Sequence, residues 1–196
     1  MNQDKIKHPF RTESPRRVCT KEYTNYQSYK KFIREDFNNR CAYTDCLDIH
    51  FGGYRTYHID HVKPKSSFPD LVNSYNNLVY SCSYVNIKKS DKVEVNIDPC
   101  DVDWNNHFYR NEHGEIFPES NSEEAVLLHK ALCLYLDRYR FVWQIQRLDE
   151  LMDKLESLIE NQGGLCSADS DVVKNYAELS MEYRKYKLYL GIELNS

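Results

Sequence analysis

The longest hydrophobic pattern in the chain lies in its C-terminal third and has helical spacing. Apolar residues recur every three or four positions between Leu127 and Leu158, and neither proline nor glycine interrupts residues 122–160. Ser120 and Glu123 can form a capping box at the start, and the glycines at 163–164 are typical of a helix end. The pattern predicts one continuous helix over 122–160, about 55–60 Å long at a rise of about 1.5 Å per residue.

A second helical pattern follows this glycine-containing turn. It begins at Asp169 or Ser170, and we expect it to end at Gly191. Two amphipathic helices joined by a short turn predict an antiparallel hairpin. A helix as long as the first cannot bury its whole apolar stripe on so small a domain. We therefore expect part of 122–190 to contact a protein partner or a second copy of the chain.

The N-terminal forty residues divide into an arm and a helix. Residues 1–20 mix charges with Pro9 and Pro15 and have no periodicity, which predicts an extended or flexible arm. Residues 22–39 carry aromatic and aliphatic side chains at three- and four-residue steps, which predicts a helix. These side chains are Tyr26, Tyr29, Phe32, Ile33 and Phe37.

The middle of the chain alternates between strand-like and loop-like segments. After a turn at 52–53, residues 54–62 are rich in β-branched and aromatic residues and predict a strand, and 63–74 predict a loop. A turn at 76–77 leads into a second short strand or a helix entry, and Asn86 to Asp91 would lie in or just before a short helix. The segment therefore predicts the order β-loop-β-α, followed by a loop-rich, acidic stretch at 96–121.

Together these patterns predict an α+β protein with a small ββα core, an N-terminal helix and a C-terminal pair of long helices. We expect four segments, with boundaries at 1–40, 41–95, 96–121 and 122–196. At 196 residues the chain has the size of one domain, or one domain with an appendage. It contains no apolar run of about 20 residues and begins with no signal-peptide pattern. We therefore expect a cytoplasmic protein without membrane spans, whose cysteines are thiols or metal ligands.

Charge is distributed unevenly along the chain. The net charge is −4, but residues 1–40 carry 10 Lys and Arg against 5 Asp and Glu, while residues 96–121 carry 1 against 6. A basic N-terminal segment next to a neutral middle suits a polyanionic partner, although a solvated basic surface has the same composition.

Candidate chemistry is concentrated in a short stretch that contains Asp60, His61 and Asn86. Hydrolysis of a phosphodiester needs a base that takes a proton from water and positive charge near the phosphate. His61 suits the base, because the ordinary pKa of histidine lies near neutrality. Asp60 and Asn86 supply hard oxygen ligands for Mg²⁺ or Mn²⁺. Asp60 and His61 can converge on one site only if the strand ends or bends there, since adjacent strand residues point to opposite faces.

Three further side chains are candidates for the same site. His58 shares a strand face with Asp60, so it is either a further metal ligand or a packing residue. Lys88 and Lys89 can contact the substrate backbone, although a solvated helix face explains them equally well.

The ordered set Asp60-His61, Asn77 and Asn86 resembles the HNH, or ββα-metal, nuclease family over residues 41–92. The resemblance implies that His61 is the general base, that Asp60 and Asn86 bind a divalent metal, and that Asn77 holds the loop after His61 through backbone hydrogen bonds. Motifs at 98–99, 107–108 and 114–118 are similar to those of bacterial restriction and defence nucleases. The nuclease subunits of antiphage systems that pair with an ATPase, such as Septu, have this layout.

The cysteines depart from the family pattern. Many HNH proteins hold a structural zinc with two Cys-x-x-Cys pairs, but here Cys41 is followed by Thr44 and Cys46, and Cys82 by Val85. A four-cysteine site cannot be completed from these residues. Either the zinc is lost, which we favour, or Cys41, Cys46 and Cys82 recruit a ligand such as His50.

Two functions of different class follow from these residues. The first is a metal-dependent HNH endonuclease that hydrolyses DNA, with RNA as a possible substrate, in a prokaryotic defence or restriction system. The alternative is a catalytically silent DNA-binding or scaffold subunit. The intact set of Asp60, His61 and Asn86 favours the nuclease.

Overall fold

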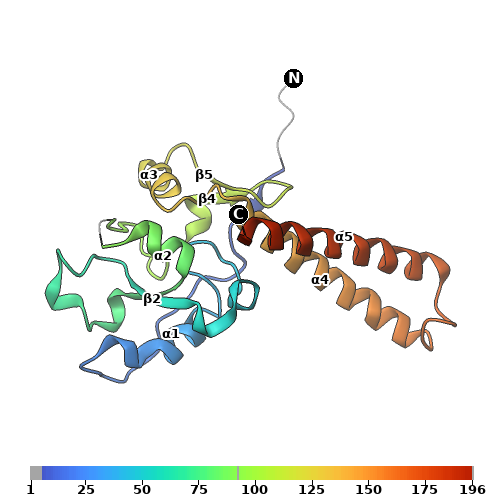
Figure 1. Ribbon diagram of the computed structural model, residues 1–196, viewed down its shortest axis with the longest axis horizontal. Helices are drawn as coiled ribbons and strands as arrows, with labels where there is room; N and C mark the ends of the chain where they lie inside the picture. Colours follow the sequence, from blue (N-terminus) through green and yellow to red (C-terminus); the bar gives the residue numbers. More distant parts are fainter. Residues whose placement is uncertain (1–5, 92, 196) are drawn as a thin grey trace. The chain divides into compact units, whose positions relative to one another are not determined.

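The computed structural model describes residues 6–91 and 93–195 of the chain (Figure 1). The chain divides into two compact units, the first ending at Leu136 and the second beginning at Asp137. Helices and small sheets are both present, so the predicted α+β class is confirmed. No helix within the described residues is long and apolar enough to cross a membrane.

The centre of the first unit is a two-stranded antiparallel sheet followed by a short helix. Strand β2 (Tyr57–His61) pairs with β3 (Leu78–Cys82), so that Tyr57 lies opposite Cys82 and His61 opposite Leu78. Helix α2 (Ser83–Lys89) follows β3 directly. The predicted order β-loop-β-α is confirmed. Strand β2 is shorter than predicted, because Gly52, with a φ of 93°, opens a 3-10 turn at Gly53–Arg55 instead of extended chain.

The N-terminal helix packs against this sheet. A 3-10 turn (Tyr26–Tyr29), capped by Asn25, leads into α1 (Lys30–Asp36), which buries Ile33 and contacts β3. The helical segment is shorter than the predicted 22–39. It begins at the Asn25 cap and ends before Asn38, whose φ is positive.

The N-terminal arm is extended but well packed over its described part, and residues 1–5 lie outside that part. Strand β1 (His8–Pro9) pairs with β4 (Phe108–Arg110), which pairs with β5 (Ile116–Pro118) in a three-stranded sheet. Phe10 lies 5.6 Å from Trp104 and 5.7 Å from Phe108 between ring centroids. The stretch 96–121, predicted to be loop-rich, thus contributes two strands and a core aromatic cluster.

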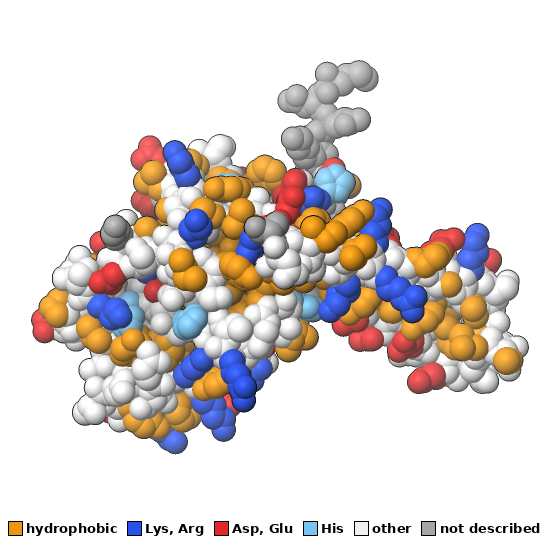
Figure 2. Space-filling model, viewed as in Figure 1, with side chains coloured by type: hydrophobic (Ala, Val, Ile, Leu, Met, Phe, Trp, Pro, Cys, Tyr) orange, Lys and Arg blue, Asp and Glu red, His pale blue; other side chains and the backbone are white. Residues whose placement is uncertain are grey.

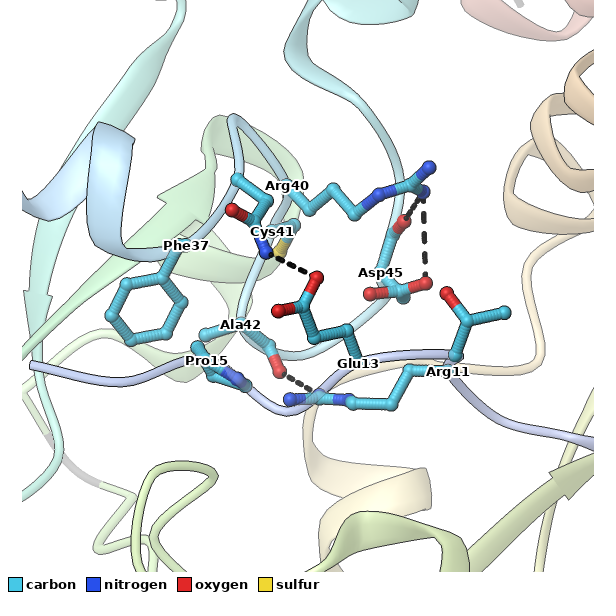
Figure 3. Close-up of a pocket in the computed structure, with 10 residues that line it drawn as sticks. Arg11, Glu13, Pro15, Phe37, Arg40, Cys41, Ala42 and Asp45 are labelled. Atoms are coloured by element: carbon cyan, nitrogen blue, oxygen red, sulfur yellow. Dashed lines mark hydrogen bonds and ion pairs between the residues drawn. The ribbon is translucent and has the colours of Figure 1, made fainter.

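Polar contacts anchor the arm next to α1. Arg11 is buried and donates to the Ala42 carbonyl oxygen at 2.6 Å, and Asn38 donates to the Glu13 carboxylate at 3.2 Å (Figure 3). A small cavity of about 190 Å³ lies between these residues. The arm is therefore part of the first unit's core.

The single helix predicted over 122–160 is wrong. Helix α3 (Glu123–Ala131) is capped by Ser122, whose side chain accepts from the Ala125 amide, so the predicted capping box at Ser120 is also wrong. A break follows in which Cys133 has a φ of 52°. Leu132 and Leu134 are both buried there, so packing on either side of the break outweighs continued helical hydrogen bonding.

The second unit is a helical hairpin, as predicted. Helix α4 (Asp137–Asn161) packs along α5 (Ser170–Asn195) in antiparallel orientation (Figure 1). An ion pair of 3.1 Å between Arg138 and Glu193 joins the open end of the hairpin. The predicted end at Gly191 is wrong, because α5 continues through this glycine to Asn195.

Candidate active site

One cavity of about 300 Å³ collects most of the candidate residues. It brings together the end of β2, the middle of α2 and the first turn of the N-terminal helix. The predicted side chains that line it are His58, Asp60, His61, Asn86 and Lys89. The remaining lining residues are Tyr26, Gln27, Lys30, Ile59, Lys65, Ser90 and Asp91. Asp60 and His61 reach the same cavity because β2 ends at His61, so the alternation of strand faces stops there.

Asp60 is a buried carboxylate with three donors around it. The Tyr43 hydroxyl donates to Oδ2 at 2.8 Å, the His61 amide donates to Oδ1 at 2.8 Å, and the Lys89 ammonium lies 3.4 Å away. Burial raises the pKa of Asp60 above its ordinary value, while the charge of Lys89 and these hydrogen bonds oppose the rise. Tyr43 lies between Cys41 and Cys46, and no pattern in the sequence singled it out as a neighbour of Asp60.

His61 is held in one orientation by two neighbours. Its Nε2 lies 2.9 Å from the Val72 carbonyl oxygen, and the Tyr26 ring meets it edge-on at 4.8 Å between centroids. A carbonyl oxygen can only accept, so Nε2 carries the proton and Nδ1 keeps the lone pair. Burial lowers the pKa of His61, which favours the neutral ring.

Asn77 lies beneath the loop that follows His61 rather than in the cavity. Its Oδ1 accepts from the Lys63 amide at 2.8 Å, and its Nδ2 donates to the Lys63 carbonyl oxygen at 3.1 Å and to that of Leu71 at 3.3 Å. The backbone carbonyl of Asn77 also accepts from the Val62 amide at 2.9 Å. One buried amide thus ties the start of β3 to both ends of the loop 63–71.

Asn86 and His58 face the cavity from different elements. Asn86 is half-buried in the middle of α2, within reach of the space beside Asp60. His58 is exposed on β2, and burial together with the charge of Lys30 lowers its pKa. The Asn86 amide oxygen and a ring nitrogen of neutral His58 each carry a lone pair, so both side chains can bind a cation in the cavity.

The two adjacent lysines of α2 have opposite environments. Lys88 is exposed, whereas Lys89 is 1% exposed. The Lys89 ammonium donates to the His61 carbonyl oxygen at 2.6 Å and pairs with Asp60. Lys89 therefore stabilises the end of β2 from the protein interior. The sequence did not indicate this position, because it suggested surface contacts for both lysines.

A protein-family model described as HNH endonuclease matches residues 41–95. Residues 41–95 are an HNH endonuclease domain. The match covers β2, β3 and α2 and includes Asp60, His61, Asn77 and Asn86. No curated protein sequence matches this chain.

The cysteines of the HNH domain lie together in its core. Cys41, Cys46 and Cys82 are buried, and the Cys82 amide donates to Cys41 Sγ at 3.4 Å. Over residues 6–91 and 93–195, no group of three or more His, Cys, Asp or Glu side chains has an arrangement suited to a metal ion. The loss of the structural zinc stays a prediction.

Part of the cavity wall comes from outside the HNH domain, from Tyr26, Gln27 and Lys30. Tyr26 and Lys30 precede the matched residues and belong to the N-terminal helical segment. The sequence predicted the helix, but it indicated only a packing position for Tyr26 and a share of the basic charge for Lys30. The spacing of four residues between them, which places both on one helical face, was the available signal.

Proposed function

We propose that this protein is a metal-dependent endonuclease that hydrolyses phosphodiester bonds of DNA. The observation that supports this most is the meeting of Asp60, His61 and Asn86 in one cavity, with Nδ1 of His61 left as an acceptor. Such a nitrogen can take a proton from a water molecule, and a neutral ring at neutral pH keeps it ready to do so.

The donor set suits a hard divalent cation. The Asp60 carboxylate and the Asn86 amide oxygen are the kind of ligands that Mg²⁺ and Mn²⁺ prefer. Bound there, such an ion would stabilise the negative charge that develops on the phosphate and the leaving oxygen. His58 is a further candidate ligand at the cavity wall. Lys89 balances part of the Asp60 charge and would share this carboxylate with the ion.

The remaining residues position the base. The hydrogen bond to Val72 fixes the His61 ring and also stabilises the ring after it has accepted a proton. Asn77 holds the loop that carries Val72 through its bonds to Lys63 and Leu71. As in the HNH family, we expect products with a 3′-hydroxyl and a 5′-phosphate.

A cleavage assay on supercoiled plasmid tests the function. The full chain should nick or linearise the plasmid with Mg²⁺ or Mn²⁺, and EDTA should abolish the reaction. Cleavage that continues undiminished in EDTA would contradict metal dependence. An RNA of the same sequence, added as competitor, separates DNA from RNA as substrate. DNA binding without any cleavage would favour the catalytically silent alternative.

We also propose that the protein acts in the cytoplasm as the effector nuclease of a prokaryotic defence or restriction system, and that the helical hairpin binds a protein partner. Exposed apolar side chains on one face of α5, at Met181, Leu188 and Ile192, support a contact surface. The partner would be an ATPase subunit or a second copy of the chain.

Replacing Leu188 and Ile192 by Glu should abolish association in light scattering and co-purification while leaving helicity unchanged. Unaltered association would contradict this role.

A further inference from the structure

The N-terminal helical segment forms one wall of the cavity although it lies outside the HNH domain. Tyr26 and Lys30 are four residues apart and both line the cavity that contains Asp60 and His61. Tyr26 contacts the His61 ring, so the wall is in place beside the proposed base. The Lys30 ammonium lies close enough to His58 for its charge to lower the pKa of that histidine.

The charges of the cavity do not cancel. Lys89 is paired with Asp60. The Asp91 carboxylate accepts hydrogen bonds from the backbone amides of Lys65 and Ser66 at 2.6 and 2.9 Å. The hydrogen bonds from Ser66, followed by the amide and the charge of Lys65, outweigh the effect of burial and lower the pKa of Asp91. The negative charges of Asp60 and Asp91, the two acids that line the cavity, are therefore already stabilised by neighbouring groups and do not neutralise Lys30. Within residues 6–91 and 93–195, Lys30 makes no salt bridge.

Lys30 is instead held against an aromatic ring. Its Nζ lies 4.4 Å from the centroid of Tyr54, a side chain that is 43% exposed. A cation over a ring face is oriented by the ring's electrons but is not neutralised. Burial lowers the pKa of Lys30, so its charged form is incompletely solvated and an anion beside it would stabilise it. Figure 2 shows Lys and Arg side chains gathered around α1 and the segment that leads to β2.

We propose that Lys30 binds a backbone phosphate of the DNA strand that is cut, next to the bond that enters the cavity. The inference rests on the proposed function. It adds a substrate-binding residue from outside the HNH domain, and it makes α1 part of the nuclease site. The Tyr54 ring holds the ammonium of Lys30, which lines the cavity and can contact a phosphate oxygen as a point charge.

DNA binding at several salt concentrations tests this proposal. We would measure the affinity for a fluorescent duplex in the His61→Ala background, so that binding is observed without cutting. Lys30→Ala should weaken binding about eightfold at about 0.1 M salt and reduce the slope of log K against log salt by about 1, as expected for one lost phosphate contact. Lys30→Arg should retain the slope.

Lys31→Ala is the matched control. Lys31 is the next residue of α1, its side chain is 76% exposed, and it faces Glu35 at 3.9 Å. This variant should keep the parental slope, and circular dichroism checks that all variants are folded. Equal slopes for Lys30→Ala and Lys31→Ala, or no binding of the duplex at all, would overturn the proposal. If the protein with His61 intact cuts no plasmid, a slope loss confined to Lys30→Ala would retain Lys30 as a phosphate contact and refute the catalytic function.

Discussion

At the scale of single residues, the buried position of Lys89 has a measurable consequence. Lys89→Ala removes the cation beside a buried carboxylate and should lower the free energy of unfolding by about 3–5 kcal/mol. Lys88→Ala, on the exposed side of the same helix, should change it by no more than about 0.5 kcal/mol. Urea denaturation measures both. Equal effects of the two substitutions would contradict the pairing of Lys89 with Asp60.

Asn77 provides a second prediction at this scale. Asn77→Ala leaves the part-buried Lys63 amide without its side-chain acceptor, which should cost about 1 kcal/mol of unfolding free energy. Cleavage should fall further than stability explains, because the loop that carries Val72 loses its attachment. Asn76→Ala, at the exposed neighbouring position, serves as control in thermal unfolding and plasmid cleavage. Cleavage by Asn77→Ala at the rate of Asn76→Ala would refute the bracing role.

The sequence indicated the chemistry of the site better than its surroundings. Asp60, His61 and Asn86 were predictable, because their residue types and order suffice to suggest a base and oxygen ligands. The orientation of Lys89 and the approach of Tyr43 were not. Both depend on how α2 and the segment with Tyr43 pack against β2. A local sequence pattern carries no information about such packing.

At the scale of elements, periodicity explains both the successes and the failures. The order β-loop-β-α and the hairpin were predictable from alternation and from helical spacing. Strands β1, β4 and β5 were missed, since two or three residues are too few for any period. The break at Cys133 was missed because apolar spacing runs through it, while tertiary packing of Leu132 and Leu134 determines the backbone.

Two glycines give a prediction at this scale. Gly191 lies inside α5, and a Cβ there would meet nothing within 4 Å. Gly191→Ala should therefore stabilise the hairpin by about 0.5–1 kcal/mol. Gly52→Ala should destabilise the protein, because Gly52 has a φ of 93° and a Cβ would lie 2.7 Å from Thr56 Cγ2. Differential scanning calorimetry measures both changes, and destabilisation by Gly191→Ala would contradict the continuity of α5.

At the scale of the whole molecule, the HNH domain is embedded in a larger first unit. Residues 41–95 supply Asp60, His61 and Asn86, while the N-terminal segment supplies Tyr26 and Lys30 to the same cavity. The arm and the second sheet add Phe10 and its aromatic neighbours to the core. This extension of the site could not be predicted from the motif, because it depends on contacts between residues far apart in the chain.

The proposed role of His61 as the base of a metal-dependent nuclease is tested by plasmid cleavage with matched proteins. Wild-type protein and His61→Ala would be compared with Mn²⁺ on the same supercoiled plasmid, with circular dichroism and duplex binding as controls for folding. Wild-type protein should cut, and His61→Ala should cut at least about 100-fold more slowly while binding DNA equally well. Cleavage by His61→Ala at the wild-type rate would contradict the account.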